Sequence, residues 1–262
     1  MVIMQKKLSF LIPIILAFIA LIVFTSPDKP IPEEPIAEVE IIPTPDFAAI
    51  TDSAAKKEAF FNYLVPFVIE KNKYILNDRA ELTRIINSES PPNREEKKWI
   101  AALRKIFKLK KVEVYTREDL EAIYPHLDII PPSLVLAQAA NESAWGTSRF
   151  ALEGNNYFGQ WCFRKGCGLV PASRDHEAKH EVRRFKGAKE SVFAYIDNLN
   201  TNAAYRPLRK TRAQLRADNK EITGLELVEG ILPYSQRGQA YVEEIRNLIN
   251  YNKLWRFNQN PN

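Results

Sequence analysis

Apolar residues recur at helical spacing over most of the chain beyond its first fifty residues. The stretch Ala54–Asn87 places its apolar side chains on one helix face, with Pro66 as the expected site of a kink. A second helix is predicted over Arg94–Lys111 and a short one near Arg117–Tyr124. We expect these segments, residues 51–128, to form a helical extension that packs on the domain after it.

The next segment predicts one helix that begins near Pro131 and stops at Gly154, because proline suits the first turn and glycine suits the end of a helix. Spacings of four and three residues put Gln138, Glu142 and Trp145 on one face of this helix. Glu142 is therefore expected at the edge between a packed face and a cleft.

Residues Cys162–Phe185 combine β-branched residues with turn formers and predict a small β-hairpin, the only sheet expected in the chain. Helical spacing returns in Lys189–Asn200, in Thr223–Leu232 and in Gly238–Trp255. No internal repeat is visible. The sequence thus predicts a mainly α fold with a small β-hairpin lobe.

The N-terminal part differs from the rest of the chain. Lys6 and Lys7 precede the uncharged stretch Leu8–Phe24, which reaches the short end of the roughly 17–25 apolar residues that span a bilayer. No A-x-A cleavage site follows, so an uncleaved membrane anchor over residues 1–25 is favoured over a removed signal peptide. Prolines then predict a semi-rigid linker over residues 26–50, and everything after the anchor is expected outside the cytoplasm.

The charge balance adds an anionic neighbourhood to this picture. The net charge is +5, and the calculated pI is about 9.0, which favours nucleic acid, a phospholipid surface or a bacterial wall with anionic polymers. The basic run Arg206–Arg216 places Arg209, Arg212 and Arg216 on one helix face. It lacks interleaved aromatic residues and any known reading motif, so a solvated face is the expected role and no nucleic-acid partner is expected.

The two cysteines are separated by four residues. In an exported chain, Cys162 and Cys167 favour a disulfide over free thiols. With His176 and His180 they also form the spacing C-x4-C-x8-H-x3-H, which imitates a structural zinc site with a shortened middle. An oxidising compartment favours the disulfide, and we expect no metal and no cofactor.

The remaining candidate chemistry is that of carboxylates, and it centres on Glu142. Glycosidic bonds are cleaved by an acid that protonates the leaving oxygen, and apolar surroundings keep such an acid protonated by raising its pKa. The loop after the predicted helix supplies amides for sugar hydroxyls and aromatic rings for pyranose faces. The predicted substrate-binding residues are Gln138, Trp145, Asn155, Asn156, Tyr157, Phe158, Gly159, Trp161 and Tyr241. The alternative is a surface glutamate beside a structural aromatic cluster.

Several motifs, in order along the chain, carry a family resemblance. The stretch LAQAANESAWGTS, the loop GNNYFG, the segment VRRFKGAKESVFAYIDNL and the stretch LPYSQRGQAYVEEI closely resemble the N-acetylglucosaminidase domains of glycoside hydrolase family 73. The similarity covers about Ile130–Tyr251. With its N-terminal apolar segment and the form GNNYFGQWCFRKGC, the whole chain looks like the Bax-type bacterial members of that family. The resemblance implies a lysozyme-like helical domain over residues 129–257.

The resemblance also implies roles for particular residues. Glu142 falls on the family's catalytic acid, Tyr234 on a tyrosine that assists in the site, and Tyr241 on its structural partner. The form YSQRGQAY is one residue longer than the family pattern and lacks its aspartate. A second carboxylate is expected in the β lobe, where Glu181 is preferred and Glu177 is next. A structural role for Glu181, in a salt bridge beside Arg183, is the alternative.

Together these features predict a peptidoglycan hydrolase that cleaves the β-1,4 bond beside N-acetylglucosamine by general acid catalysis. Its expected partners are peptidoglycan glycan strands and, through residues 1–25, the inner membrane. Its expected location is the periplasmic face of that membrane in the bacterial envelope. Two alternatives remain open: a lytic transglycosylase, and a catalytically inactive protein that binds the cell wall.

Overall fold

The computed structural model describes residues 43–172 and 180–258. The predicted membrane anchor and most of the predicted linker lie outside the described residues. Within the described ranges, no helix is long and apolar enough to cross a membrane. Residues 44–262 form one compact unit, the body of the protein.

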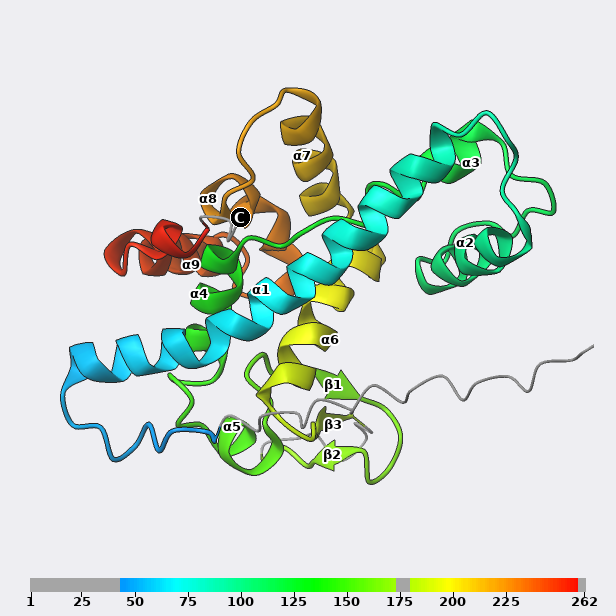
Figure 1. Ribbon diagram of the computed structural model, residues 1–262. Helices are drawn as coiled ribbons and strands as arrows, with labels where there is room; N and C mark the ends of the chain where they lie inside the picture. Colours follow the sequence, from blue (N-terminus) through cyan, green and yellow to red (C-terminus); the bar gives the residue numbers. More distant parts are fainter. Residues whose placement is uncertain (1–42, 173–179, 259–262) are drawn as a thin grey trace, which may run out of the picture. The chain divides into compact units, whose positions relative to one another are not determined.

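The body is mainly helical, as the sequence predicts, with one small sheet among the described residues (Figure 1). Its elements, in chain order, are α1 (Ser53–Ile86), α2 (Arg94–Ile106), α3 (Arg117–Glu121), α4 (Pro132–Glu142), α5 (Arg149–Gly154), β1 (Trp161–Cys162), β2 (Gly168–Leu169), β3 (Glu181–Arg183), α6 (Ala188–Thr201), η1 (Ala203–Tyr205), α7 (Arg206–Ala217), α8 (Gly224–Leu227), η2 (Val228–Tyr234), α9 (Gln239–Tyr251) and η3 (Leu254–Phe257).

The long helix α1 crosses the body diagonally and packs against α4 and α6 (Figure 1). Asp52 caps its N-terminus by accepting a hydrogen bond of 2.7 Å from the backbone of Ala55. The helix continues through Pro66, and its apolar face buries Phe60, Leu64 and other side chains completely. These side chains belong to the same hydrophobic core as residues of α4 and α6. The predicted helical extension therefore supplies part of the core against which α4, the helix of Glu142, packs.

The helix predicted from Pro131 to Gly154 is broken in the structure, and α4 ends at Glu142. Ala144, Trp145 and Gly146 follow with φ values of 49°, 58° and 78°. The buried Ser143 stabilises this turn, because its hydroxyl donates to the carbonyl of Ala139 at 2.7 Å and accepts from the N–H of Gly146 at 2.8 Å. Glu142 is therefore the last residue of a helix, and Trp145 leaves the helix face on which the sequence placed it.

Only glycine fits at position 146. Its φ lies in the left-handed region, and a Cβ there would approach the ring of Phe47 to 2.4 Å. The N-terminal segment that carries Phe47 thus packs directly over the turn that follows Glu142. Packing from a distant part of the chain decides where the helix stops.

The sheet is three-stranded and antiparallel, with β3 between β1 and β2. Its register pairs Cys162 with Glu181 and Gly168 with Arg183. A Cβ at position 168 would lie 1.9 Å from the carbonyl oxygen of Val182, so β2 requires glycine where it meets the central strand.

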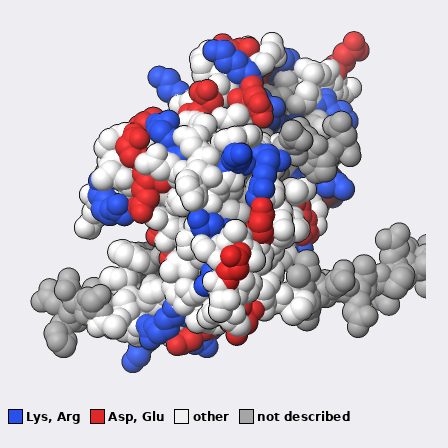
Figure 2. All heavy atoms as spheres, turned by 90° about the vertical axis from the view of Figure 1, so that its left-hand side faces the viewer, with Lys and Arg blue, Asp and Glu red and all other residues white. Residues whose placement is uncertain are grey.

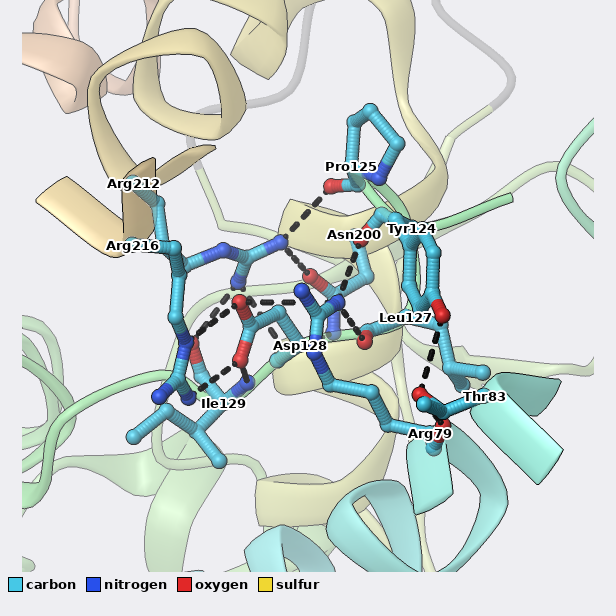
Figure 3. A network of polar contacts seen from close by, with 10 residues as sticks. All are labelled: Arg79, Thr83, Tyr124, Pro125, Leu127, Asp128, Ile129, Asn200, Arg212 and Arg216. Carbon is cyan, nitrogen blue, oxygen red and sulfur yellow. Dashed lines mark hydrogen bonds and ion pairs between the residues drawn. The ribbon is translucent and has the colours of Figure 1, made fainter. Parts of the chain in front are cut away.

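The basic helix α7 is held by a buried polar network (Figure 3). Arg212 is 1% exposed and donates to the carbonyls of Pro125 and Ile129 and to the side chain of Asn200 at 2.8–2.9 Å. Arg216 donates two hydrogen bonds to the buried carboxylate of Asp128, at 2.8 and 3.1 Å. The network ties α7 to α6 and to the segment that leads into α4.

For Arg209 and Arg212, this network corrects the prediction that Arg209, Arg212 and Arg216 form a solvated face, whereas the side chain of Arg216 is 39% exposed. Arg209 is 4% exposed, and Arg212 is fully buried. Buried guanidinium groups are tolerated where carbonyl oxygens and carboxylates satisfy their donors. Local spacing alone could not show that the cationic face turns inward.

The charged residues on one outer face are mixed in sign. Figure 2 views the body from the left-hand side of Figure 1, where α9 and the start of α1 lie, and shows blue and red groups interspersed. Ion pairs of α9 fit this pattern, such as Arg246 with Glu229 at 2.6 Å and Arg237 with Glu244 at 2.7 Å. The positive net charge is not gathered on this face.

Candidate active site

Glu142 is half-buried at the C-terminal end of α4. Each of its two carboxylate oxygens lies next to a different residue. Tyr241, from α9, donates a hydrogen bond of 2.8 Å to Oε1. On the other side lies Gly159, which has a φ of 63° and whose built Cβ would be 3.8 Å from Oε2. The loop that contains Gly159 thus approaches the carboxylate with no side chain in between.

A chain of buried hydrogen bonds sets the direction in which Tyr241 donates. Tyr195, from α6, donates to Oε1 of Gln138, and Nε2 of Gln138 donates to the Tyr241 hydroxyl at 2.9 Å. An amide N–H can only donate, so the Tyr241 oxygen accepts there and directs its own proton to Glu142. Gln138 is 0% exposed, which corrects its predicted contact with substrate: it positions Tyr241 instead.

The surroundings raise the pKa of the Glu142 carboxyl above its ordinary value. Burial is the largest cause, and the charge of Glu244 adds to it. Hydrogen bonds from Tyr241 and Asn141 and the charge of Arg237 act in the opposite direction without cancelling the increase. The C-terminal end of α4 carries partial negative charge, which also disfavours a carboxylate there. Glu142 has the environment of an acid that keeps its proton.

Tyr234 lies beside this arrangement without bonding to Glu142. Its ring stacks on that of Tyr241, with centroids 5.7 Å apart and an interplanar angle of 3°. Its hydroxyl donates a hydrogen bond of 2.6 Å to the carbonyl of Phe158. Tyr234 therefore fixes both Tyr241 and the loop residue next to Gly159.

The two loop asparagines are occupied by the backbone. Asn155 has a left-handed φ of 50° and donates to the carbonyl of Phe185 at 3.1 Å. Asn156 is 1% exposed; its Nδ2 donates to the carbonyls of Gln160 and Arg183 at 2.9 and 2.8 Å, and its Oδ1 accepts two loop N–H groups. The Asn156 amide shapes the loop against β3, which corrects its expected contact with sugar hydroxyls.

The predicted sugar-stacking rings of Tyr157 and Phe158 are core side chains, each 1% exposed. Tyr157 packs near Phe60 of α1, at a centroid distance of 6.1 Å. Phe158 stacks on Tyr195 at 4.1 Å, with an interplanar angle of 12°. Neither ring has a free face for a pyranose, so this part of the prediction is wrong. The sequence could not distinguish a loop that exposes its rings from one that buries them.

The two predicted sugar-binding tryptophans differ in exposure: Trp145 packs against α1, and Trp161 lies at the surface. Trp145 packs edge-on against Phe60 and Phe61 of α1, at 5.8 and 5.4 Å, and Lys57 lies over its ring. Trp161, on β1, is 58% exposed and stacks on His180 at 4.0 Å. Of the loop aromatics in the prediction, Trp161 is the one that offers a ring at the surface.

Glu181 is 6% exposed and supports the β lobe. Its two carboxylate oxygens accept the N–H groups of Gly166 and Gly168, at 2.9 and 2.8 Å. The turn it holds is closed by a disulfide between Cys162 and Cys167, with a sulfur–sulfur distance of 1.96 Å. These contacts fit a structural anion, and they are different from the salt bridge to Arg183 that the sequence suggested.

The same disulfide bears on the zinc alternative. The sulfur atoms lie near the Glu181 carboxylate, but cysteines joined to each other provide no thiolate for a metal. His176, together with the alternative acid Glu177, lies outside the described residues.

Sequence reasoning missed one member of the site, Tyr195. Its position within a helical run indicates a core residue, and it is indeed completely buried. Its hydroxyl nevertheless starts the hydrogen-bond chain to Glu142. Only the packing of α6 on α4 and α9 brings it there, so no local signal could have identified it.

Similarity to known proteins shows the family of the chain. Residues 119–254 match the glucosaminidase family described as mannosyl-glycoprotein endo-beta-N-acetylglucosaminidase. The chain is 34% identical over 199 residues to Protein bax of Escherichia coli (strain K12), which covers 75% of this chain and 70% of that protein. No solved structure matches the chain significantly. The chain therefore belongs to the glucosaminidase family, and within that family it is a Bax-type protein.

Proposed function

We propose that the protein is a peptidoglycan hydrolase that cleaves the β-1,4 glycosidic bond beside N-acetylglucosamine, with Glu142 as the general acid. Membership of the glucosaminidase family supports glycosidase chemistry on a glycan substrate. The observation that carries the residue assignment is the half-buried carboxyl of Glu142, which is bonded to Tyr241 through Oε1 and has Oε2 beside the side-chain-free Gly159.

The direction of the hydrogen-bond chain assigns the acidic proton to one oxygen. Oε1 accepts the hydrogen bond from the Tyr241 hydroxyl, so we assign the acidic proton of Glu142 to the other oxygen, Oε2. This proton passes to the glycosidic oxygen as the bond to C1 breaks, and the Tyr241 hydroxyl stabilises the carboxylate that is left. Water then supplies the hydroxyl group at C1, and its other proton restores the acid.

The sugar contacts of the proposal lie on the loop and on the β lobe. Tyr234 holds the loop through the carbonyl of Phe158, so it acts on the geometry around Gly159. Trp161 is the proposed stacking ring because, of the aromatic side chains that the sequence predicts to bind sugar in the loop, it is the one that is exposed. Both oxygens of Glu181 accept backbone N–H groups, which favours a structural role. A direct catalytic role for Glu181 stays a prediction. The acetamido group of the substrate is the alternative source of assistance.

Location in the bacterial envelope, with residues 1–25 as an inner-membrane anchor, remains part of the proposal. It follows from the sequence of that segment, which lies outside the described residues. Peptidoglycan strands are the glycan that an enzyme in this place would meet.

Digestion of purified peptidoglycan with the full chain, followed by mass spectrometry of the products, tests the proposal. Reducing-end N-acetylglucosamine is the expected product, and Glu142→Gln should remove it because the amide has no acidic proton. Products with 1,6-anhydromuramic acid would replace the proposal with a lytic transglycosylase. Equal binding of peptidoglycan by both proteins, without cleavage, would identify a wall-binding protein. A mannosyl glycoprotein serves as the comparison substrate.

A further inference from the structure

A pocket of about 670 Å³ lies where the end of α2, the segment before α4 and the junction of α6 and α7 meet. None of the residues that line it is an aspartate or glutamate. The polar residues relevant here are Lys108, His126, Asn202, Arg206, Arg209 and Lys210. None of them belongs to the hydrogen-bond chain of Glu142, so this pocket is separate from the proposed hydrolase site.

The cations reach the pocket from two sides. Arg206, Arg209 and Lys210 have the spacing i, i+3, i+4 and share one face of α7. Lys108 comes from the end of α2, where its left-handed φ of 55° closes the helix. The side chains of Lys108, Arg206 and Lys210 form no ion pair with any residue in the described ranges. Their charge is available to a ligand.

The two buried arginines of α7, Arg212 and Arg209, differ in whether a carboxylate lies near them. Arg212 donates to the backbone carbonyl of Asp128 at 3.1 Å, and the charge of the buried Asp128 carboxylate nearby favours its charged form (Figure 3). Arg209 is almost as buried and donates through Nη1 to the carbonyls of Leu199 and Asn202, each at 2.8 Å. No carboxylate of the described part of the chain pairs with Arg209, and burial together with the charge of Arg206 lowers its pKa. A buried cation without a counter-ion is costly, and an anion in the pocket would offset that cost.

His126 also lines the pocket. Its ring stacks on Phe107, with centroids 5.3 Å apart, and its Nδ1 contacts the carbonyl of Asn200 at 2.8 Å. A carbonyl oxygen can only accept, so Nδ1 carries a proton and Nε2 is the ring nitrogen with no bond to described residues. Burial lowers the pKa of His126, and the charges of Arg209, Arg212 and Arg206 lower it further, so the ring is neutral and Nε2 is an acceptor. The charge of the pocket therefore comes from its arginines and lysines.

We propose that this pocket binds a phosphate group, held by Arg206, Lys210 and Lys108 above the buried charge of Arg209. Guanidinium and ammonium groups are the side chains that bind phosphate most strongly, and several of them from different elements match its several oxygens. The group comes either from a soluble phosphate or from the head group of an anionic lipid. The inference goes beyond the proposed hydrolase function and does not depend on Glu142.

Calorimetric titration of the full chain in a nonionic detergent tests the proposal. The titrants are inorganic phosphate and detergent micelles that contain phosphatidylglycerol, with phosphatidylcholine micelles as the neutral comparison. Saturable binding of inorganic phosphate indicates a soluble ligand, and binding of phosphatidylglycerol alone indicates a lipid head group. Either result supports the pocket only when the substitutions below weaken it. If neither titrant binds, the proposal is wrong.

The double variant Arg206→Gln, Lys210→Gln removes two exposed cations that form no ion pair among the described residues, so it should fold. Loss of these charge-assisted contacts should weaken binding by about tenfold or more. Lys73→Gln, Lys97→Gln makes the same change of charge on exposed sites away from the pocket, and less than a twofold effect is expected. Equal weakening in both variants would show general attraction to anions and overturn the proposal. Peptidoglycan cleavage should be equal in all three proteins, which keeps this test distinct from that of Glu142.

Discussion

The hydroxyl of Tyr241 donates a hydrogen bond of 2.8 Å to Oε1 of Glu142, although the two residues are 99 positions apart in the chain. Gln138 fixes this direction by donating to the same hydroxyl oxygen. The pair thus determines which oxygen of the proposed acid carries the proton, and it makes the pH dependence of the reaction a test of the arrangement.

Tyr241→Phe should shift the alkaline limb of the pH–rate profile to higher pH. The lost hydrogen bond favours the carboxylate form, so its removal raises the pKa of Glu142 further, and the acid keeps its proton to higher pH. A hydrogen bond to a charged group is worth roughly 1.5–3 kcal/mol, which corresponds to about one pH unit or more. The dependence of kcat/KM on pH measures it. Tyr251→Phe, at an exposed tyrosine, should leave the limb in place; a shift to lower pH in Tyr241→Phe would contradict the assignment.

Gln138→Met should destabilise the protein by roughly 1–3 kcal/mol, because two buried tyrosine hydroxyls lose the partner between them. It should also reduce cleavage, since Tyr241 becomes free to turn its proton away from Glu142. Denaturant unfolding and product release provide the two measurements. Gln214→Met, on the surface of α7, should change stability by less than about 0.5 kcal/mol. A fully active Gln138→Met protein would rule out the positioning role.

Asp128→Asn should lower stability at neutral pH by roughly 3–5 kcal/mol, because it removes a buried charge that binds Arg216 and acts on the buried Arg212. Burial acts to raise the pKa of Asp128, but the hydrogen bond from Arg216 and the charges of Arg212 and Arg79 outweigh burial and lower it.

The pKa values of Asp128 in the folded and in the unfolded protein set the pH range over which it stabilises the fold. The contribution of Asp128 is complete above the unfolded pKa of about 3.9 and is lost as pH falls through the lower folded value. Unfolding free energies between pH 7 and pH 2 should therefore fall more steeply for the wild type than for Asp128→Asn. Asp218→Asn is the surface control, and parallel curves for the wild type and Asp128→Asn would refute the prediction.

Glu181→Gln should loosen the β lobe, because its amide N–H₂ would face one of the two backbone N–H groups that the carboxylate now accepts. We expect a loss of about 1–3 kcal/mol in stability, with Glu153→Gln as the exposed control. Differential scanning calorimetry and the cleavage rate must be read together. An unchanged melting temperature with a large loss of rate would instead identify Glu181 as a catalytic group.

Trp161→Ala should raise KM several-fold with a smaller effect on kcat, because an exposed ring that stacks on a sugar contributes roughly 0.5–1.5 kcal/mol to binding. Phe163→Ala removes a neighbouring ring that is 75% exposed and should have little effect. Initial rates over a range of soluble glycan concentrations separate the two constants. Equal effects of both substitutions would argue against Trp161 as the stacking ring.

Much of the helix content was predictable because apolar residues at helical spacing must bury one face. The run around Phe60 and Leu64 became α1, and the stretch from Lys189 became most of α6. The break after Glu142 was not predictable in this way. Gly146 is a poor helix former, but one glycine does not fix where a helix ends, and the turn forms because Ser143 and the packing of Phe47 on Gly146 stabilise it.

The sequence alone indicated the family and the candidate acid Glu142, because these depend on residues close together in a recognisable order. It also determined the candidate disulfide, since Cys162 and Cys167 are a few residues apart in a chain that carries an apolar N-terminal segment. These features depend on short stretches, and short stretches keep their information before folding.

The tertiary structure alone decided which side chains face the site. It buried Tyr157, Phe158 and Asn156 and turned Trp145 toward α1. It also brought Tyr241 to Glu142 and Tyr195 to Gln138 from elements far apart in sequence. Burial and hydrogen-bond partners are properties of the packed core, in which each side chain competes for space and donors with residues from the whole chain. The same competition turned Arg212 inward to Asp128 and left Arg209 facing a pocket without an acid.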